Sequence, residues 1–384
     1  MPSNKGSNQS IYLDHASTTP LDGEVLAAMR PYFCEEFGNA SSQHAYGMRA
    51  ANAVVAARDE MAVALGISPH ELYFTSCGTE SDNLGIKGIS LAAAERGKHI
   101  VVSAVEHPAV IQSALDLKEF GFEVTFVYPD ENGVVSPQTV QNCMRADTVL
   151  VAVMSANNET GVIQPVKEIC AAVHAMGVYL WCDCVQTAGV LPVSEFPADG
   201  FAISAHKFYG PKGVGAACIK RGVLFRRQLA GGQQERGMRG GTLNTPGIAG
   251  MACALSLSLK RAAHDNEYVA SLRNAFESII LSSVPDVFIN GGAAQRLPSH
   301  SNISFCGCDA QNLVFALDMR GVACSAGAAC SSGASKPSHV LQAMNVGEQR
   351  LKSAVRFSFG KNNTVRQVEC AAEAVIAAVK AIRG

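Results

Sequence analysis

Short apolar runs typical of β-strands alternate with amphipathic helical patterns between about residues 50 and 220. In Val166–Met176, for example, apolar side chains at 166, 169, 170, 173 and 176 have the spacing of one helix face. This alternation predicts an α/β fold in which helices cover both faces of a mainly parallel sheet. The expected strands are Leu72–Thr75, Ile100–Ala104, Glu123–Tyr128, Thr148–Met154, Val178–Cys182, Phe201–Ser204 and Val214–Ile219.

The C-terminal part of the chain has a different pattern. Residues 228–247 are rich in glycine, arginine and polar residues, which predicts a long exposed loop. Helical patterns and isolated strand-like runs follow this loop, and their order predicts a smaller α+β domain. The expected helices are Ile248–Arg261, Glu267–Leu281, Ala310–Arg320 and Val365–Ile382, and the expected strands are Asn302–Cys306 and Ala354–Phe359.

Length and charge limit the classes of protein to consider. The 384 residues suffice for roughly two domains. A formal net charge of −2 gives no reason to expect a nucleic-acid surface or an anchor to an anionic membrane. No apolar run approaches the ~20 residues of a membrane-spanning helix. The first ten residues are polar and lack the apolar core of a signal peptide.

The 13 cysteines are mostly placed in apolar strand-like or helix-like stretches. Their number is odd, and no C-x-x-C pair is followed by a second pair, so we expect neither a structural zinc site nor another metal centre. Reduced thiols in this number favour a cytoplasmic location.

Two ionisable residues stand at the ends of apolar strands. Lys207 follows Phe201–Ser204 closely and enters a Gly/Pro-rich loop. Desolvated lysines have a lowered pKa and act as Schiff-base nucleophiles, although a surface lysine is the simpler interpretation of this position alone. Asp183 ends the run Val178–Cys182, at the strand end where α/β sheets bind ligands. A structural carboxylate or a helix N-cap is the alternative for Asp183.

A third pattern points to an anion site. The strand Leu72–Thr75 leads to Gly78, and Thr79-x-x-Asp82 then has the form of a capping box. Free N–H groups at a helix N-terminus bind phosphate, and capping without a ligand is the simpler alternative. His107 and Asn158 also follow strand-like runs, so we expect them at the same sheet edge.

These motifs, in this order, resemble those of the cysteine desulfurases, which are fold-type I pyridoxal-phosphate (PLP) enzymes of the class V aminotransferase type. The resemblance runs from Tyr12–Asp14 to Val355–Gly360 and so covers nearly the whole chain. It implies a homodimer whose large PLP-binding domain spans about 15–260. The small domain would combine 1–14 with 261–384.

The resemblance assigns a role to each residue around the cofactor. Lys207 would form the Schiff base with PLP, and Asp183 would pair with the pyridinium nitrogen. Gln186 and Asn158 would bond the phenolic oxygen, and His107 would stack on the ring and take part in catalysis.

The phosphate and substrate ends of the site follow from the same resemblance. Thr242 would reach the phosphate from the neighbouring subunit. Arg356, with Asn158, would hold the substrate α-carboxylate, a role that suits a planar two-pronged donor. The phosphate cradle would consist of Gly78, Thr79, Ser204 and His206.

The segment of about 321–336 is dominated by small residues, which predicts a mobile loop. It contains Cys330, which the resemblance identifies as the nucleophile that receives sulfur as a persulfide. Taken in isolation, Cys330 would be an ordinary loop cysteine. Cys324, six positions earlier, departs from the family pattern, and the two thiols could form a disulfide or exchange the persulfide. Trp181 stands where the family often has histidine.

The expected reaction converts L-cysteine to L-alanine and passes the sulfur to an acceptor or scaffold protein for iron–sulfur cluster assembly or thiolation. A selenocysteine lyase would share all of these residues. A PLP aminotransferase or β-lyase would form a keto acid, and a catalytically silent scaffold would keep only the fold. No direct nucleic-acid or membrane partner is expected.

Overall fold

The main sheet forms the centre of the structure, a computed structural model that describes residues 10–327 and 337–384. Within those residues it has seven strands in the order β2-β8-β7-β6-β5-β3-β4. Only β8 runs against its neighbours, so the expected mainly parallel sheet is confirmed. The strands are β2 (Leu72–Thr75), β3 (His99–Ser103), β4 (Glu123–Val127), β5 (Thr148–Ala152), β6 (Tyr179–Asp183), β7 (Gly200–Ser204) and β8 (Gly215–Ile219).

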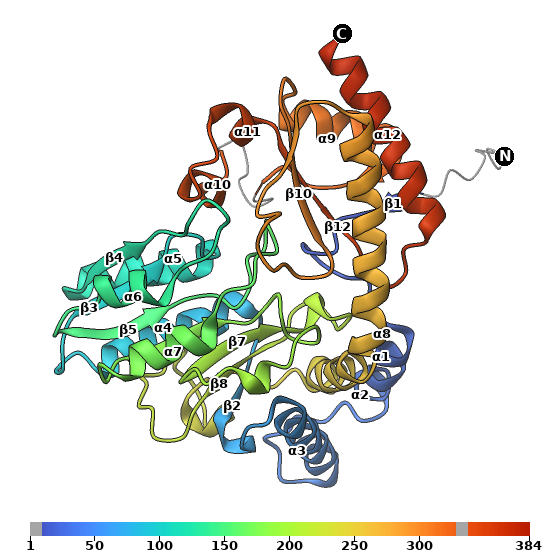
Figure 1. The fold of residues 1–384 in the computed structure, drawn as a ribbon. Helices are drawn as coiled ribbons and strands as arrows, with labels where there is room; N and C mark the ends of the chain where they lie inside the picture. The colour runs from blue at the N-terminus through green and yellow to red at the C-terminus, as the bar shows by residue number, and fades with distance from the viewer. Residues whose placement is uncertain (1–9, 328–336) are drawn as a thin grey trace.

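Both faces of this sheet are buried under helices (Figure 1). In β6, Leu180 and Cys182 belong to one apolar core, whereas Trp181 between them belongs to the core on the opposite face. Successive side chains of a strand point to opposite faces, which explains why the strands are continuous apolar runs. The helices of this part are α1 (Gly23–Met29), α2 (Pro31–Cys34), α3 (Ala45–Leu65), α4 (Gly78–Ala92), α5 (Pro108–Asp116), α6 (Pro137–Cys143) and α7 (Val166–His174).

One long helix, α8 (Thr245–Ser283), replaces the two helices expected over 248–261 and 267–281. The residues between the two expected helices include no glycine or proline, so nothing in the backbone ends the helix there. Met251 packs into a core of the main sheet, and Phe276 packs into the C-terminal core. The helix therefore runs beside both parts of the molecule (Figure 1).

The C-terminal core lies between α8 and a small antiparallel sheet of order β12-β10-β9. The first strand, β1 (Ile11–Tyr12), pairs in parallel with β11 (Val322–Ala323). The division into 15–260 and 1–14 with 261–384 stays a prediction, and α8 crosses its boundary. The remaining elements are β9 (Val287–Ile289), β10 (His300–Phe305), β12 (Ala354–Ser358), α9 (Ala310–Asp318), α10 (His339–Ala343), α11 (Glu348–Lys352) and α12 (Val365–Arg383).

The 228–247 loop is not exposed throughout, contrary to expectation. Glu235 is buried, and its carboxylate accepts hydrogen bonds from the Phe74 N–H and from both terminal nitrogens of Arg58. This ion pair ties the loop to β2 and α3. Short 3-10 helices complete the fold: η1 (Pro69–Glu71), η2 (Leu117–Phe120), η3 (Val193–Glu195), η4 (Ala205–Lys207) and η5 (Gln234–Gly237).

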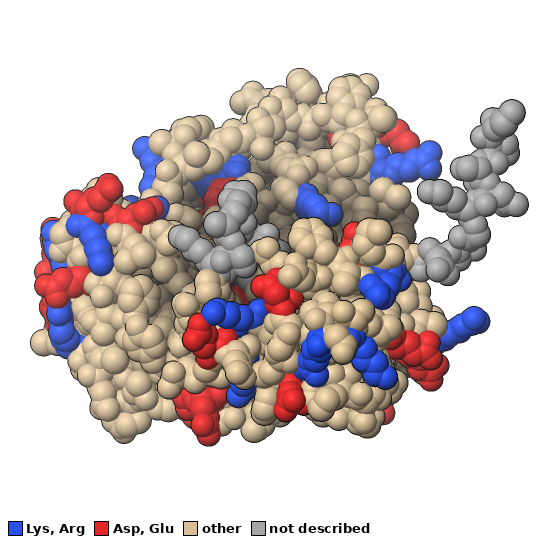
Figure 2. Space-filling view, turned by 90° about the horizontal axis from the view of Figure 1, so that it is seen from above, with Lys and Arg blue, Asp and Glu red and all other residues tan. Residues whose placement is uncertain are grey.

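Charged side chains of both signs are interspersed over the surface seen from above (Figure 2). This distribution agrees with the small formal net charge of −2.

Phe276 is the aromatic centre of the C-terminal core, with ring centroids 4.8 Å from Phe357 and 5.4 Å from Phe359. We expect Phe276→Ala to lower the free energy of unfolding by about 3–5 kcal/mol, because a buried cavity replaces the ring. Denaturant unfolding measures this loss. Phe315→Ala is the control, since Phe315 is 69% exposed, and equal losses in both variants would contradict the assignment of the core.

Candidate active site

A cavity of about 330 Å³ lies where the main sheet meets the C-terminal part. Its wall is built from the carboxyl ends of strands of the main sheet and the turns and helix starts that follow them, together with Ala16 and Ser17 of the N-terminal turn and Arg356 of β12. The structure brings together there ten of the residues expected to act on cofactor or substrate: Gly78, Thr79, His107, Asn158, Asp183, Gln186, Ser204, His206, Lys207 and Arg356.

The other two expected residues are Thr242 and Cys330. Thr242 is exposed and does not line the cavity of its own chain. Cys330 lies outside the described residues.

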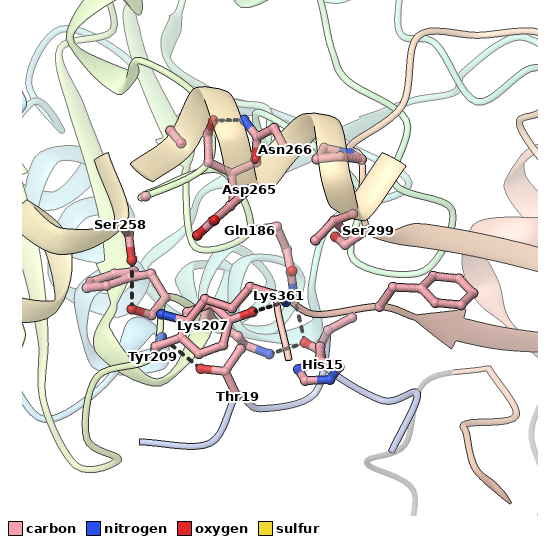
Figure 3. Close-up of a pocket in the computed structure, with 18 of the residues that line it drawn as sticks. His15, Thr19, Gln186, Lys207, Tyr209, Ser258, Asp265, Asn266, Ser299 and Lys361 are labelled. Carbon is pink, nitrogen blue, oxygen red and sulfur yellow. Dashed lines mark hydrogen bonds between the residues drawn. The ribbon is translucent and has the colours of Figure 1, made fainter. Parts of the chain in front are cut away.

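Lys207 ends the 3-10 helix that directly follows β7. Its Nζ donates hydrogen bonds to the carbonyl oxygens of Ala16 (2.5 Å) and Ser17 (2.9 Å). Lys207 also lines a second cavity of about 70 Å³, together with Gln186 and with Asp265 of α8 (Figure 3). The lysine therefore lies between the N-terminal turn and two cavities.

Asp183 is the last residue of β6 and is buried. Burial raises the pKa of its carboxyl group to about 6, although the Val185 N–H at 2.8 Å and the charge of Lys207 both act to lower it. The group is therefore mainly ionised at neutral pH and becomes protonated in mild acid.

His107 is the N-cap of α5, followed by Pro108 at the first helical position. Its Nδ1 accepts a hydrogen bond from the Ala109 N–H (3.1 Å), so the neutral ring carries its proton on Nε2. Burial lowers the pKa of His107 to about 4, and the charges of Lys207 and His339 add to this effect. Burial also lowers the pKa of His206 to about 4. Both rings are neutral at neutral pH.

The start of α4 forms one end of the cavity. Cys77, its N-cap, makes no side-chain hydrogen bond to the helix, so the first N–H groups are left for another acceptor. A Cβ at Gly78 would stand 2.7 Å from Cγ2 of Val185, so only glycine fits there without displacing Val185. Among the described residues, Ser204 Oγ nearby is buried and has no hydrogen-bond partner. This end of the cavity has the donors of an anion site.

The expected capping box of Thr79 and Asp82 is wrong. Asp82 is buried, and its Oδ1 accepts a hydrogen bond from the indole N–H of Trp181 (3.0 Å). Burial, and then the nearby Asp183, raise the pKa of Asp82 well above its ordinary value. The N–H group of a buried tryptophan needs a hydrogen-bond acceptor. Trp181 in an apolar run indicates this need, but the sequence does not show which residue supplies the acceptor.

Arg356 enters the cavity from β12 with a nearly buried side chain. Its guanidinium bonds to Asp14, Ser17 and the carbonyl of Asn158. Sequence reasoning missed the first two contacts, which join residues more than 330 positions apart and have no local signal.

Cys324 directly follows β11 and packs against the C-terminal core. Burial raises the pKa of its thiol to about 12, with Asp14 adding to the shift. A thiol with this pKa is protonated at neutral pH and is a poor nucleophile.

We expect Cys324 to resist iodoacetamide in the native protein at pH 7.5, while the exposed Cys34 and Cys370 are alkylated. Because the pKa is raised, native labelling of Cys324 should increase only as the pH approaches 12. Peptide mass spectrometry measures the labelling, and denatured protein is the positive control. Alkylation of Cys324 at the rate of Cys34 would contradict the burial of its thiol.

Comparisons with known proteins agree on one family. The model of the family Aminotransferase class-V matches residues 11–370. Cysteine desulfurase IscS of Dictyoglomus turgidum is 40% identical over 358 residues, which are 93% of this chain and 91% of that protein. Cysteine desulfurase IscS of Anaeromyxobacter sp. (strain Fw109-5) is 43% identical over 378 residues, 97% of this chain and 93% of that protein.

Solved structures show the same likeness. A NifS-like protein matches with a TM-score of 0.90 and 34% identity, over 96% of this chain and 98% of the other. A NifS-like protein from Rickettsia africae matches with a TM-score of 0.87 and 30% identity, over 97% and 99% of the two chains.

Proposed function

This chain belongs to the class-V aminotransferase family, and from that premise we infer that it is a PLP-dependent cysteine desulfurase. Its substrate is L-cysteine, its product is L-alanine, and it passes the sulfur to an acceptor that serves iron–sulfur cluster assembly. The observation that supports this function most strongly is the meeting of ten motif residues from six separate segments of the chain around one cavity.

The cavity fits PLP. Gly78 leaves room for the phosphate at the start of α4, and Ser204 Oγ and Asn158 Oδ1 are buried without a partner in the described part of the chain. Lys207 and Asp183 face the same space from neighbouring strand ends. When bound, PLP supplies an electron sink that stabilises a carbanion at the substrate Cα.

Separate groups of residues would hold the ring and the phosphate of the cofactor. Lys207 would hold the cofactor through its amine, and the Asp183 carboxylate would keep the ring nitrogen protonated. The neutral His107 ring would stack on the cofactor, with Gln186 and Asn158 at the phenolic oxygen. The phosphate would be held by Gly78, Thr79, Ser204 and His206, and by Thr242 of a second subunit.

The substrate is positioned by charge. Arg356 would bind its carboxylate, because a guanidinium presents paired N–H donors that match two carboxylate oxygens. Once free, the amine of Lys207 would remove the Cα proton.

Sulfur transfer requires a thiolate, and we assign it to Cys330 on the resemblance to the desulfurases. The Cys330 thiolate would attack the substrate sulfur, so that an S–S bond forms as the substrate C–S bond breaks and its electron pair remains on carbon. The raised pKa of Cys324 supports this choice, since Cys324 is protonated where the reaction runs.

We further propose a cytoplasmic homodimer. The exposure of Thr242 supports the dimer, because this threonine does not line its own cavity and its exposed side chain is available to a partner subunit. Among the described residues, no helix is both long and apolar enough to cross a membrane.

The ionisation of Asp183 predicts how PLP binding depends on pH. Its pKa is raised to about 6, so the carboxylate is present above pH 6 and is protonated below it. A protonated carboxyl cannot pair with a pyridinium cation, so we expect PLP affinity of the apoprotein to fall by up to about tenfold per pH unit below 6. Absorbance titration with PLP from pH 8 to pH 5 measures this fall.

Asp183→Asn is the matched control for this titration. It should bind PLP more weakly at pH 8 and should lack the additional fall below pH 6. A wild-type affinity that stays level from pH 8 to pH 5, or that falls equally in Asp183→Asn, would show that Asp183 does not pair with the ring nitrogen.

Mass spectrometry after incubation with L-cysteine and no reductant tests the function itself. The wild-type protein should form alanine and gain one sulfur atom on the peptide that contains Cys330, as should Cys324→Ser. Cys330→Ser should still change the PLP absorption on adding L-cysteine but should lose both alanine release and the sulfur adduct. A sulfur adduct that follows Cys324 instead would reassign the nucleophile, and faster turnover of selenocysteine than of cysteine would contradict the substrate.

A further inference from the structure

The Arg356 guanidinium has five N–H hydrogens, of which three are used by described residues. Nη1 donates to the carbonyl oxygen of Asn158 (2.8 Å). Nη2 donates to Oδ1 of Asp14 (2.8 Å) and to Oγ of Ser17 (2.7 Å), so both of its hydrogens are taken. In contrast, Nε is buried and has no partner within the described chain.

This pattern leaves no free pair of donors for a carboxylate. A guanidinium presents two edges with paired N–H groups, one formed by Nε and Nη2 and the other by Nη1 and Nη2. Each edge needs one Nη2 hydrogen, and both are occupied. A substrate carboxylate can therefore bind through two oxygens only if Asp14 or Ser17 gives up its hydrogen bond.

The two partners of Nη2 differ in how firmly they are held. Asp14 is charged, and its Oδ1 also accepts a hydrogen bond from the Ser325 hydroxyl (3.1 Å), which fixes it between two donors. Asp14 is also absent from the wall of the cavity. Ser17 is neutral and lines the cavity, and its hydroxyl makes its hydrogen bond to Arg356.

We propose that Ser17 and Asp14 are positioning residues for substrate binding, with opposite effects on Arg356. Asp14 keeps its hydrogen bond to Nη2 both before and after the substrate binds. The Ser17 hydroxyl occupies the Nη2 hydrogen that faces the cavity until a substrate carboxylate replaces it. One oxygen of that carboxylate then takes the freed Nη2 hydrogen and the other takes the unpartnered Nε hydrogen.

This exchange rests on the proposed function, since it names how that site receives an amino-acid carboxylate. It has a consequence for affinity. Substrate binding breaks the Ser17–Arg356 hydrogen bond. This bond therefore stabilises the substrate-free enzyme and weakens the binding of substrate. Removing the hydroxyl should tighten binding, whereas removing the charge of Asp14 should weaken it.

The test compares Ser17→Ala with Asp14→Asn in the PLP-loaded enzyme. Ser17→Ala should lower KM for L-cysteine by about 3- to 10-fold, the effect of one net hydrogen bond, and should affect KM more than kcat. Asp14→Asn should raise KM by a similar factor. A general disturbance of the site would change KM in the same direction in both variants. Opposite changes in KM therefore identify the exchange.

Two controls bear on the hydroxyl and the carboxylate. Ser17→Thr keeps the hydroxyl and should keep KM near the wild-type value. Cysteamine has no carboxylate, so its dissociation constant, measured from the change in PLP absorption, should be the same in Ser17→Ala and wild type. A Ser17→Ala enzyme with unchanged or higher KM, or with equally tightened binding of cysteamine, overturns the proposal.

L-alanine separates this proposal from the proposed function. Its dissociation constant, read from the same absorption change, should also fall in Ser17→Ala, because it carries the same carboxylate. If the wild-type protein forms no alanine from L-cysteine, the desulfurase assignment fails, but the titration with L-alanine still tests the exchange at Arg356. If Asp14→Asn does not fold, the Ser17 variants and cysteamine decide the outcome.

Discussion

Because both faces of the central strands of the main sheet are buried, the residues that line the cavity stand at the carboxyl ends of these strands. Leu180, Trp181 and Cys182 in β6 are each fully enclosed, so the first polar side chain of that segment is Asp183 at its carboxyl end. Parallel neighbours end at the same edge, and the same rule places Ser204 and the turn with Lys207 beside Asp183. The site follows from the topology of the sheet.

Burial also shifts the pKa values of the ionisable groups at this edge of the sheet. It raises the pKa of Asp183 to about 6 and lowers the pKa of His107 to about 4, so at neutral pH the first is an anion and the second is neutral. Burial favours the uncharged form of both groups, and Asp183 stays an anion at neutral pH because the Val185 N–H and the charge of Lys207 limit the rise of its pKa. The same effect separates the cysteines: Cys324 is partly buried and its thiol is protonated at neutral pH, whereas Cys34 and Cys370 are exposed.

Arg356 completes the site from the other side, and burial of its charge requires compensation. Asp14 supplies an anion, and Ser17 and the Asn158 carbonyl supply neutral acceptors. These partners come from the N-terminal segment and from the turn after β5, so the guanidinium joins three parts of the chain. The two terminal nitrogens are held in this way, whereas Nε has no partner among the described residues, and in our proposal the substrate carboxylate competes with the weakest of these partners.

The sequence by itself determined the α/β class and the positions of most strands, because periodicity and burial patterns are local properties. Six of the residues that line the cavity follow from strand-end motifs, and the resemblance to the cysteine desulfurases added Gln186, Ser204, His206 and Arg356. Its errors arose where packing decides. Helix α8 continues from one core to the other because no glycine or proline interrupts it between them, and Asp82 bonds to Trp181 rather than capping its own helix. The pairing of Asp14 with Arg356 joins positions 342 residues apart. Only the tertiary structure sets such contacts, because they depend on how complete elements pack and not on any spacing along the chain.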